Sequence, residues 1–267
     1  MSNLQLRVIS AVILAAIVLI LTWIGGLPFR LLAIVIAAAM FYEWVSMTRG
    51  GLKISPFMPY CAFGLSMLVL FWMPNVLIVL MAIILPAAIA ALFAETRGQG
   101  IWVAKGFLYA AASGLALSYL RGDSDAGLIA ILFLFAVVWA TDIAAYFVGR
   151  AFGGPKLALT ISPGKTWSGA IGGTTGGIAA GMTIGALSGE ASYGLFVTAV
   201  LLSVVAQIGD LFESSVKRFA GIKDSSNLIP GHGGVMDRVD GLVVAAMALY
   251  VIGALAGHPD QPALALF

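Results

Sequence analysis

Hydrophobic residues dominate this chain in nine long runs, separated by polar stretches that often contain glycine or proline. A helix needs about 20 mostly apolar residues to cross the hydrocarbon core of a bilayer, and most of the runs approach that length. The pattern therefore predicts an all-α integral membrane protein with about nine transmembrane helices. The runs are Leu4–Ile24, Phe29–Met47, Phe57–Met73, Val76–Phe93, Val103–Leu120, Leu128–Val148, Gly169–Leu187, Tyr193–Ile208 and Leu242–Ala256.

Composition agrees with this class, because 61% of the 267 residues are hydrophobic and only 10% are charged. Cys61 is the only cysteine, which excludes a disulfide framework and a multi-cysteine metal site. The net charge of +2 gives no sign of a nucleic-acid partner, and we expect none. In a membrane protein the position of the basic residues is more informative than their number.

The basic residues indicate an orientation. With the N-terminus inside, twelve of the 14 Lys and Arg residues fall on the inner side, and only Arg30 and Arg121 fall outside. Positive residues concentrate in cytoplasmic loops, so the pattern predicts an N-in, C-out topology. The topology places the polar clusters described below on the cytoplasmic side. We expect one integrated membrane domain, with a scaffold of about five spans over residues 1–120 and a catalytic region over residues 121–267.

Charge gathers in one segment, Gln207–Gly241. The chain has 14 Lys or Arg and 12 Asp or Glu residues, and nine of these lie between Asp210 and Asp240. A charge at the centre of a membrane helix costs about 2.5–3.5 kcal/mol on insertion scales. A requirement of folding alone would not place so many charges beside apolar spans, and we interpret the segment as the functional site. The nine are Asp210, Glu213, Lys217, Arg218, Lys223, Asp224, Asp237, Arg238 and Asp240.

The spacing of these charges suggests their chemistry. Asp210, Glu213 and Lys217 follow one another at helical spacings of three and four residues, so they share one face of a helix. Asp237 and Asp240 would share a face if the last helix begins there. Mg²⁺ commonly binds one or two carboxylates together with substrate phosphates, and basic residues stabilise the remaining phosphate charge. The segment predicts metal-assisted chemistry on a phosphorylated substrate; the alternative is a solvated loop held by mutual salt bridges.

His232 lies in the glycine-rich turn between the two acidic stretches. It could bind phosphate, act as an acid or base, or cap a turn. We do not expect zinc, because no cysteine or second histidine is near it in the sequence.

Two further stretches carry candidate residues. Asp142 lies inside the sixth run, with Tyr146 one helical turn later. An acid within a span favours a functional role, and the alternative is an ion pair that locks helix packing. The stretch Ile161–Gly173 contains helix-start residues and Lys165, and a helix N-terminus suits phosphate. The glycines that follow are more typical of close helix packing.

The pattern from Ser214 to Asp240 resembles the signature of the phosphatidate cytidylyltransferases, also called CDP-diacylglycerol synthases. It includes Val216-Lys217-Arg218, Lys223-Asp224, Ser226, Ile229-Pro230, His232-Gly233-Gly234-Val235 and Asp237-Arg238-Val239-Asp240. The similarity extends to Gly209–Ser214, to Ser162-Pro163 through Thr166, and to the span with Asp142 and Tyr146. One departure is that Gly164 and Ser168 stand where the family has a basic and an acidic residue.

The resemblance implies transfer of a cytidylyl group from CTP to phosphatidic acid, giving CDP-diacylglycerol and pyrophosphate for phospholipid biosynthesis. It implies dependence on Mg²⁺, held by Asp210 and Asp237, and allows a second cation. It also implies a homodimer, for which residues 1–120 would supply the interface. We expect the bacterial cytoplasmic (inner) membrane, with the active site facing the cytoplasm.

The residues expected to act in the reaction follow from the signature and from the stretches above. The expected catalytic residues are Asp210, Asp237, Lys217, Arg218 and Asp142. The expected substrate-binding residues are Ser162, Lys165, Thr166, Lys223, Asp224, His232, Gly233, Gly234, Arg238, Asp240, Tyr146 and Glu213.

Three other functions compete with this interpretation. A CTP-dependent lipid-alcohol kinase would share the nucleotide site but release CDP. A CDP-alcohol phosphotransferase would need an arginine that does not follow Asp240-Gly241 at the required spacing. A cation-coupled transporter could explain Asp142, but such proteins often carry inverted repeats, and the sequence shows none.

Overall fold

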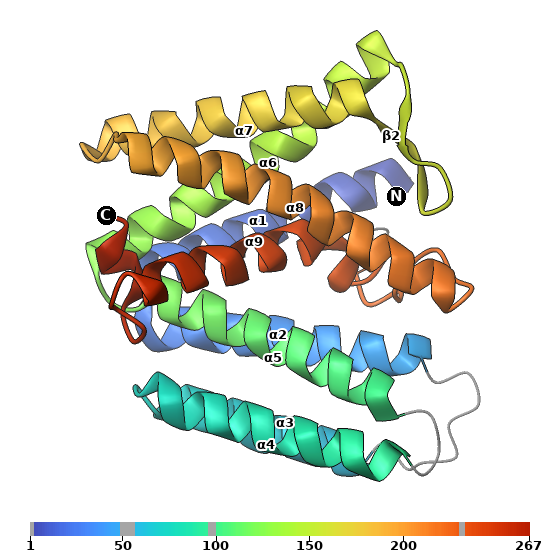
Figure 1. The fold of residues 1–267 in the computed structure, drawn as a ribbon, viewed down its shortest axis with the longest axis vertical. Helices are drawn as coiled ribbons and strands as arrows, with labels where there is room; N and C mark the ends of the chain where they lie inside the picture. Colours follow the sequence, from blue (N-terminus) through green and yellow to red (C-terminus); the bar gives the residue numbers. More distant parts are fainter. Residues whose placement is uncertain (1–2, 49–56, 96–99, 230–232) are drawn as a thin grey trace. The chain divides into compact units, whose positions relative to one another are not determined.

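Nine α-helices form the part of the chain that the computed structural model describes, which is residues 3–48, 57–95, 100–229 and 233–267 (Figure 1). A two-stranded hairpin and a short 3₁₀ helix, η1, complete it. The helices are α1 Asn3–Ile24, α2 Gly26–Thr48, α3 Phe57–Trp72, α4 Val76–Glu95, α5 Gly100–Arg121, α6 Asp125–Phe152, α7 Trp167–Ser188, α8 Tyr193–Phe219 and α9 Met236–Leu255. The strands are β1 Lys156–Ala158 and β2 Ser162–Thr166, and η1 is Pro262–Ala265.

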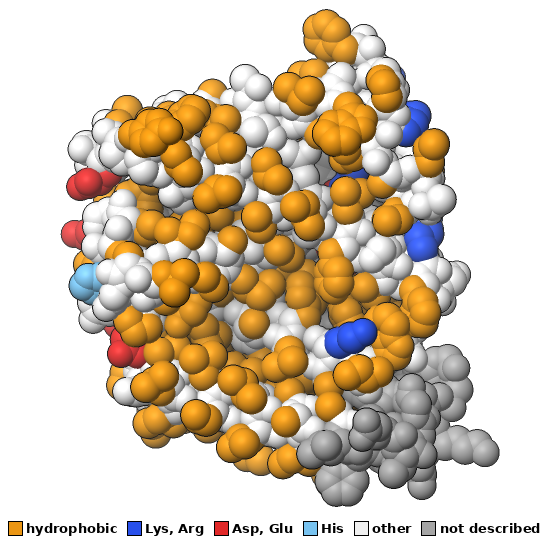
Figure 2. Space-filling model, in the orientation of Figure 1, with side chains coloured by type: hydrophobic (Ala, Val, Ile, Leu, Met, Phe, Trp, Pro, Cys, Tyr) orange, Lys and Arg blue, Asp and Glu red, His pale blue; other side chains and the backbone are white. Residues whose placement is uncertain are grey.

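The prediction of an all-α membrane protein is confirmed. Among the described residues, six helices are long and apolar enough to cross a membrane, namely α2, α5 from Ile101, and α6 to α9. Three shorter apolar helices accompany them: Ile9–Ile24, Phe57–Trp72 and Val76–Ala91. Large hydrophobic side chains such as Phe152, Leu187 and Leu255 are exposed, and hydrophobic side chains cover much of the face seen in Figure 2. Lipid would cover such a surface. The N-in, C-out orientation stays a prediction.

The chain divides into two compact units. One contains residues 1–118 and 220–238, and the other contains residues 119–219 and 239–267. The first unit therefore holds α1 to α4, most of α5, the segment after α8 and the first turn of α9. The second holds α6 to α8, the hairpin and the rest of α9. We expected one integrated domain, made of a scaffold over residues 1–120 and a catalytic region over residues 121–267. That division stays a prediction.

An aromatic cluster organises the first unit. The ring of Phe41 in α2 contacts Phe63 of α3 at a centroid distance of 4.5 Å and Phe107 of α5 at 5.5 Å. One turn along α2, the indole of Trp44 donates a hydrogen bond to the carbonyl of Trp102. A side chain at Gly106 would overlap the Trp44 ring, so glycine allows α5 to lie directly against α2.

Helices α6 and α7 of the second unit (Figure 1) pack together along a stripe of glycines. Every fourth residue of α7 is a buried glycine, at positions 169, 173, 177, 181 and 185. A Cβ atom at Gly173 would lie only 2.8 Å from the Thr141 carbonyl oxygen of α6. Thr141 also forms a hydrogen bond of 2.8 Å with Ser203 of α8. Small residues that let helix backbones approach closely are typical of membrane proteins, so packing explains these glycines.

The hairpin is the element that the sequence analysis did not predict. Its strands pair antiparallel, with Lys156 opposite Thr166 and Ala158 opposite Ser162. Strands of three and five residues are too short to show a clear alternation of polar and apolar positions. We had expected only an inner loop that opens the seventh helix.

The glycine stripe yields a prediction. We expect Gly177→Val to destabilise the protein, because a Cβ there would collide with the Thr141 hydroxyl and lie 3.0 Å from the Val137 carbonyl oxygen. Overpacking of this kind costs about 1–3 kcal/mol. Thermal unfolding in detergent should show a clear loss of stability, whereas Thr175→Val, on the exposed side of α7, should unfold close to the wild-type temperature.

Candidate active site

A cavity of about 650 Å³ lies within the second unit. It is lined by the C-terminal half of α6, the hairpin, the start of α7 and one turn of α8. The chemically useful side chains on its wall are those of Asp142, Tyr146, Arg150, Lys156, Lys165, Gln207 and Asp210. The cavity therefore combines acidic and basic groups from four segments that are up to 68 positions apart in the sequence.

The start of α7 forms one wall of the cavity. Thr166 caps this helix, because its hydroxyl accepts a hydrogen bond from the Gly169 amide at 3.1 Å. Gly149 of α6 and Gly169 of α7 face each other so closely that a Cβ at either would lie within 3.4 Å of the other's Cα. A helix N-terminus carries partial positive charge and free N–H groups, so this wall of the cavity suits an anionic group.

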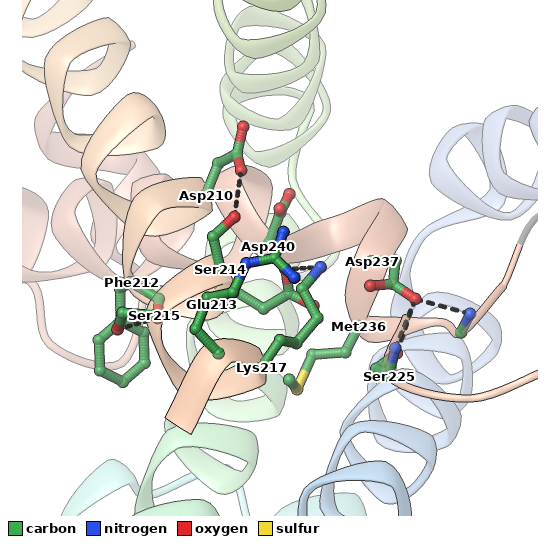
Figure 3. Close-up of polar contacts among 12 residues, drawn as sticks. Asp210, Phe212, Glu213, Ser214, Ser215, Lys217, Ser225, Met236, Asp237 and Asp240 are labelled. Atoms are coloured by element: carbon green, nitrogen blue, oxygen red, sulfur yellow. Dashed lines mark hydrogen bonds and ion pairs between the residues drawn. The ribbon is translucent and has the colours of Figure 1, made fainter. Parts of the chain in front are cut away.

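An ion pair stands in the cavity. The Lys165 ammonium of β2 lies 2.5 Å from the Asp210 carboxylate of α8. The two side chains are 26% and 35% exposed, so the pair is open to exchange with a substrate or a cation. Ser214, one turn further along α8, donates a long hydrogen bond of 3.4 Å to the other oxygen of Asp210 (Figure 3).

Further basic groups line the same cavity, and the sequence analysis missed them. Arg150 donates a hydrogen bond of 2.9 Å to the Tyr146 hydroxyl, and Lys156 lies on the hairpin. Gln207 donates to Thr174 of α7 at 3.1 Å. Arg150 and Lys156 lie in the sequence between the two candidate stretches, after Asp142 and before Ser162, and this position was the available signal.

The C-terminal end of α8 carries a second ion pair. Lys217 lies 2.6 Å from Glu213, whose side chain is fully buried. Arg218 donates a hydrogen bond to the Ile161 carbonyl of the hairpin turn, which ties the end of α8 to the hairpin. Asp240 of α9 interacts electrostatically with Asp210, Asp142 and Lys217. Acids from α6, α8 and α9 are therefore gathered in one region of the second unit.

An apolar hollow of about 430 Å³ adjoins the cavity. It lies between α7 and α8, and Trp167, Ile171 and Leu211 are among its lining residues. Leu157, Ala170 and Gln207 line both the hollow and the cavity. A polar site and an apolar surface are thus continuous within this unit.

The first unit holds the other half of the charged segment. One oxygen of Asp237, Oδ2, accepts hydrogen bonds from the Ser225 amide, the Ser225 hydroxyl and the Gly234 amide, each at 2.9 Å (Figure 3). Gly233 has a φ of +85°, which favours glycine. Asp237 therefore fixes the turn that precedes α9, and a metal bound by Asp237 would have to use Oδ1.

Glu43 of α2 is a residue that the sequence analysis did not select. It is fully buried, and its carboxylate accepts hydrogen bonds from the Val235 and Met236 amides, both at 2.7 Å. Glu43 lies within the run Phe29–Met47, so the rule that an acid inside a span indicates function, which we applied to Asp142, would have found it.

The expected site residues fall into two groups. Asp142, Tyr146, Lys165, Thr166 and Asp210 line the cavity of the second unit, and Ser162, Glu213, Lys217, Arg218 and Asp240 belong to the same unit. Lys223, Asp224, Gly233, Gly234, Asp237 and Arg238 belong to the first unit, where Lys223, Asp224 and Arg238 are exposed. His232 lies outside the described residues. The roles of all these residues stay predictions.

The acidic side chains of the cavity suit a Mg²⁺ ion that also binds substrate oxygens, and they do not suit a metal site made of protein ligands alone. In the described part of the chain, no three Asp, Glu, His or Cys side chains are grouped so as to hold a metal ion. Mg²⁺ needs only one or two carboxylates when substrate phosphates supply further oxygens. Asp142 and Asp210 offer carboxylates to the cavity, and Asp210 already accepts a cationic partner in Lys165.

Comparison with known proteins identifies the family. The family described as "Cytidylyltransferase family" matches residues 5–256. The chain belongs to this family. A phosphatidate cytidylyltransferase of Brucella suis is 49% identical over 270 residues, covering 100% of this chain and 99% of the relative. The enzyme of the same name from Rickettsia bellii is 33% identical over 95% of this chain and 92% of the relative. That of Bacillus subtilis is 32% identical over 96% of this chain and 99% of the relative. The resemblance seen in the signature is thereby confirmed over the full chain.

The cap of α7 yields a second prediction. We expect Thr166→Ala to lower stability by about 1 kcal/mol, because the Gly169 amide loses its acceptor. Thr166→Ser keeps the oxygen and should behave nearly as the wild type. Thermal unfolding of both variants in detergent checks this, and equal losses in the two would contradict the capping role.

Proposed function

We propose that this protein is a phosphatidate cytidylyltransferase, which transfers the cytidylyl group of CTP to phosphatidic acid and releases pyrophosphate. The product is CDP-diacylglycerol, the activated lipid of phospholipid biosynthesis. The observation that carries this conclusion is the 49% identity to an enzyme of that name along the whole chain. The polar cavity, with its basic residues and its adjoining apolar hollow, has the chemistry that a nucleotide and a lipid phosphate require.

The reaction needs no nucleophilic side chain. An oxygen of the lipid phosphate attacks the α-phosphorus of CTP, and the bond from that phosphorus to the bridging oxygen of pyrophosphate breaks. Both reactants are polyanions, so the protein must hold them together and offset their charge. In phosphoryl-type transfers, positioning and electrostatic stabilisation do most of the work.

The basic residues divide that task. Lys165, Arg150 and Lys156 share the cavity wall with the N-terminus of α7, and they would bind the phosphates of CTP. Lys217 and Arg218, at the inner end of α8, would bind the lipid phosphate or the leaving pyrophosphate. Lys223 and Arg238 are further candidates for binding phosphate. The polar residues Ser162, Tyr146 and Thr166 would orient the substrates.

Mg²⁺ would be held by Asp210 and Asp237, and Asp142 is a candidate ligand for a second cation. A bound divalent cation supplies charge neutralisation to the triphosphate. Asp210 suits this role because its carboxylate faces the cavity and already pairs with an ammonium group. A cation held there would replace Lys165 as the partner of Asp210, and Lys165 would then be able to bind phosphate.

The lipid tails require little from the protein. We place the headgroup in the cavity and one acyl chain against the adjoining apolar hollow between α7 and α8, while the rest stays in the membrane. The site faces the cytoplasm, where CTP is found, and the enzyme acts in the bacterial inner membrane as a homodimer. The bacterial relatives support the assignment to a bacterial membrane.

Product labelling tests the proposed reaction. Purified protein in detergent is given phosphatidic acid, Mg²⁺ and CTP labelled at the α-phosphorus. We expect label to enter the lipid phase and EDTA to abolish the transfer. Label transferred from the γ-phosphorus would instead indicate a lipid kinase, and no transfer of either label by folded protein would refute the proposal.

Substitutions in the ion pair test the site. Asp210→Asn and Lys165→Met should each lower kcat/KM for CTP on the order of 100-fold, because each removes a charge that stabilises the transition state. Both should stay folded, because a partly exposed ion pair contributes at most about 1 kcal/mol.

Matched controls accompany these substitutions. Glu190→Gln removes an exposed acid between α7 and α8, and Lys105→Met removes an ammonium that lies 4.6 Å from the Trp102 ring centroid. Both controls should keep the wild-type rate. A fully active Asp210→Asn protein would exclude Asp210 as a metal ligand.

A further inference from the structure

The Glu43 carboxylate accepts four hydrogen bonds from the signature segment, which is the stretch from Ser214 to Asp240. Its Oε1 accepts from the Val235 amide at 2.7 Å and from the Ser226 hydroxyl at 2.6 Å. Its Oε2 accepts from the Met236 amide at 2.7 Å, and the Ser225 hydroxyl lies 3.1 Å away. Each oxygen therefore faces one backbone amide and one serine. All of these residues belong to the first unit.

The position of Glu43 makes it a cap supplied from a distant helix. The first amides of an α-helix have no partner within the helix. At the start of α9, the amides of Val235 and Met236 find their acceptor in α2, which is more than 190 positions away in the sequence. The preceding amide, that of Gly234, donates to Asp237. The two carboxylates together satisfy three consecutive amides at this turn.

Ser225 connects the two acids. Its hydroxyl lies 3.1 Å from Glu43 Oε2 and 2.9 Å from Asp237 Oδ2. A hydroxyl has a single proton, so one proton is shared between the two carboxylates. A shift of Glu43 would therefore be transmitted directly to the carboxylate of Asp237.

Gly234 leaves the space that Glu43 needs. A Cβ atom at Gly234 would lie 2.6 Å from Glu43 Oε1 and would overlap the Ser225 hydroxyl. The expected role of Gly234 in substrate binding stays a prediction. The contacts show a structural task, which is to let the buried carboxylate reach the backbone of the segment.

We propose that Glu43 is a positioning residue for catalysis. Its carboxylate fixes Ser225, Ser226 and the start of α9 so that Asp237 and Arg238 present their side chains to the substrates. This inference rests on the proposed role of the segment in cytidylyl transfer. A buried carboxylate that receives donors on both oxygens is acceptor-only, and no other residue type of this size reproduces that pattern. Part of the N-terminal helices would thus belong to the catalytic apparatus.

Glu43→Gln is the sharpest test. The amide of glutamine has one accepting oxygen, so its NH₂ group must face either the Val235 or the Met236 amide, neither of which can accept. We expect kcat for CDP-diacylglycerol formation to fall about 10- to 100-fold, the factor that corresponds to losing a hydrogen bond to a charged group. Hydrogen exchange should become faster in peptides that cover residues 225–236.

Phe41→Leu is the matched control. Phe41 is buried in α2 two positions earlier, and its ring packs on Tyr60, Phe63 and Phe107 rather than on the segment. It should lower the unfolding temperature at least as much as Glu43→Gln while keeping kcat near the wild-type value. Exchange in residues 225–236 should stay slow in this variant.

A double-mutant cycle with Ser226→Ala separates positioning from stability. Ser226→Ala should lower kcat in the wild-type background and have little further effect when Glu43 is already glutamine, because both changes disrupt one network. Equal kcat for Glu43→Gln and Phe41→Leu, or additive effects in the cycle, would overturn the inference. Failure of the proposed function is distinguishable, since the wild-type protein itself would then form no labelled lipid.

Discussion

The structure depends on how each carboxylate at the edge of the apolar helices is compensated. A buried charge is costly unless hydrogen bonds or an opposite charge satisfy it. Glu43 is satisfied by amides and hydroxyls, and Glu213 by Lys217. One oxygen of Asp237 holds three donors, while Asp210 pairs with Lys165 in an open cavity. These different partners assign different tasks to the acids.

An acid that accepts hydrogen bonds from backbone amides is suited to fixing the position of a segment. An acid whose partner is an exposed ammonium group is suited to binding a metal ion or a substrate. Glu43 cannot exchange its backbone donors without moving the start of α9. We propose that the partly exposed Asp210 would exchange Lys165 for a metal ion, which would leave the lysine to bind phosphate. The apolar helices provide rigid ends for both kinds of site, and the glycine stripe of α7 lets α6 approach closely enough for the cavity wall to form.

Much of this could be predicted from the sequence. Apolar length located the nine helices of the described residues, because that signal is local. The concentration of charge is also a local signal, and it selected Asp210–Asp240 as the functional segment, which stays a prediction. The hairpin was missed because its two strands are short. Glu43 was missed because its partners lie more than 180 positions away, although an acid within an apolar run was itself a signal. The extension of α8 from Ile208 to Phe219 follows from the Glu213–Lys217 spacing, which apolar length does not measure.

We propose above all that the Asp210 carboxylate in the cavity binds the catalytic cation. The most direct test of this proposal is a change of metal preference in Asp210→Cys, made in a Cys61→Ser background because Cys61 is an exposed thiol. Thiolates prefer soft cations to Mg²⁺. We expect this variant to be inactive with Mg²⁺ and to regain cytidylyl transfer with Cd²⁺, whereas the Cys61→Ser protein should keep its Mg²⁺ dependence. Full activity of Asp210→Cys with Mg²⁺ would contradict the account.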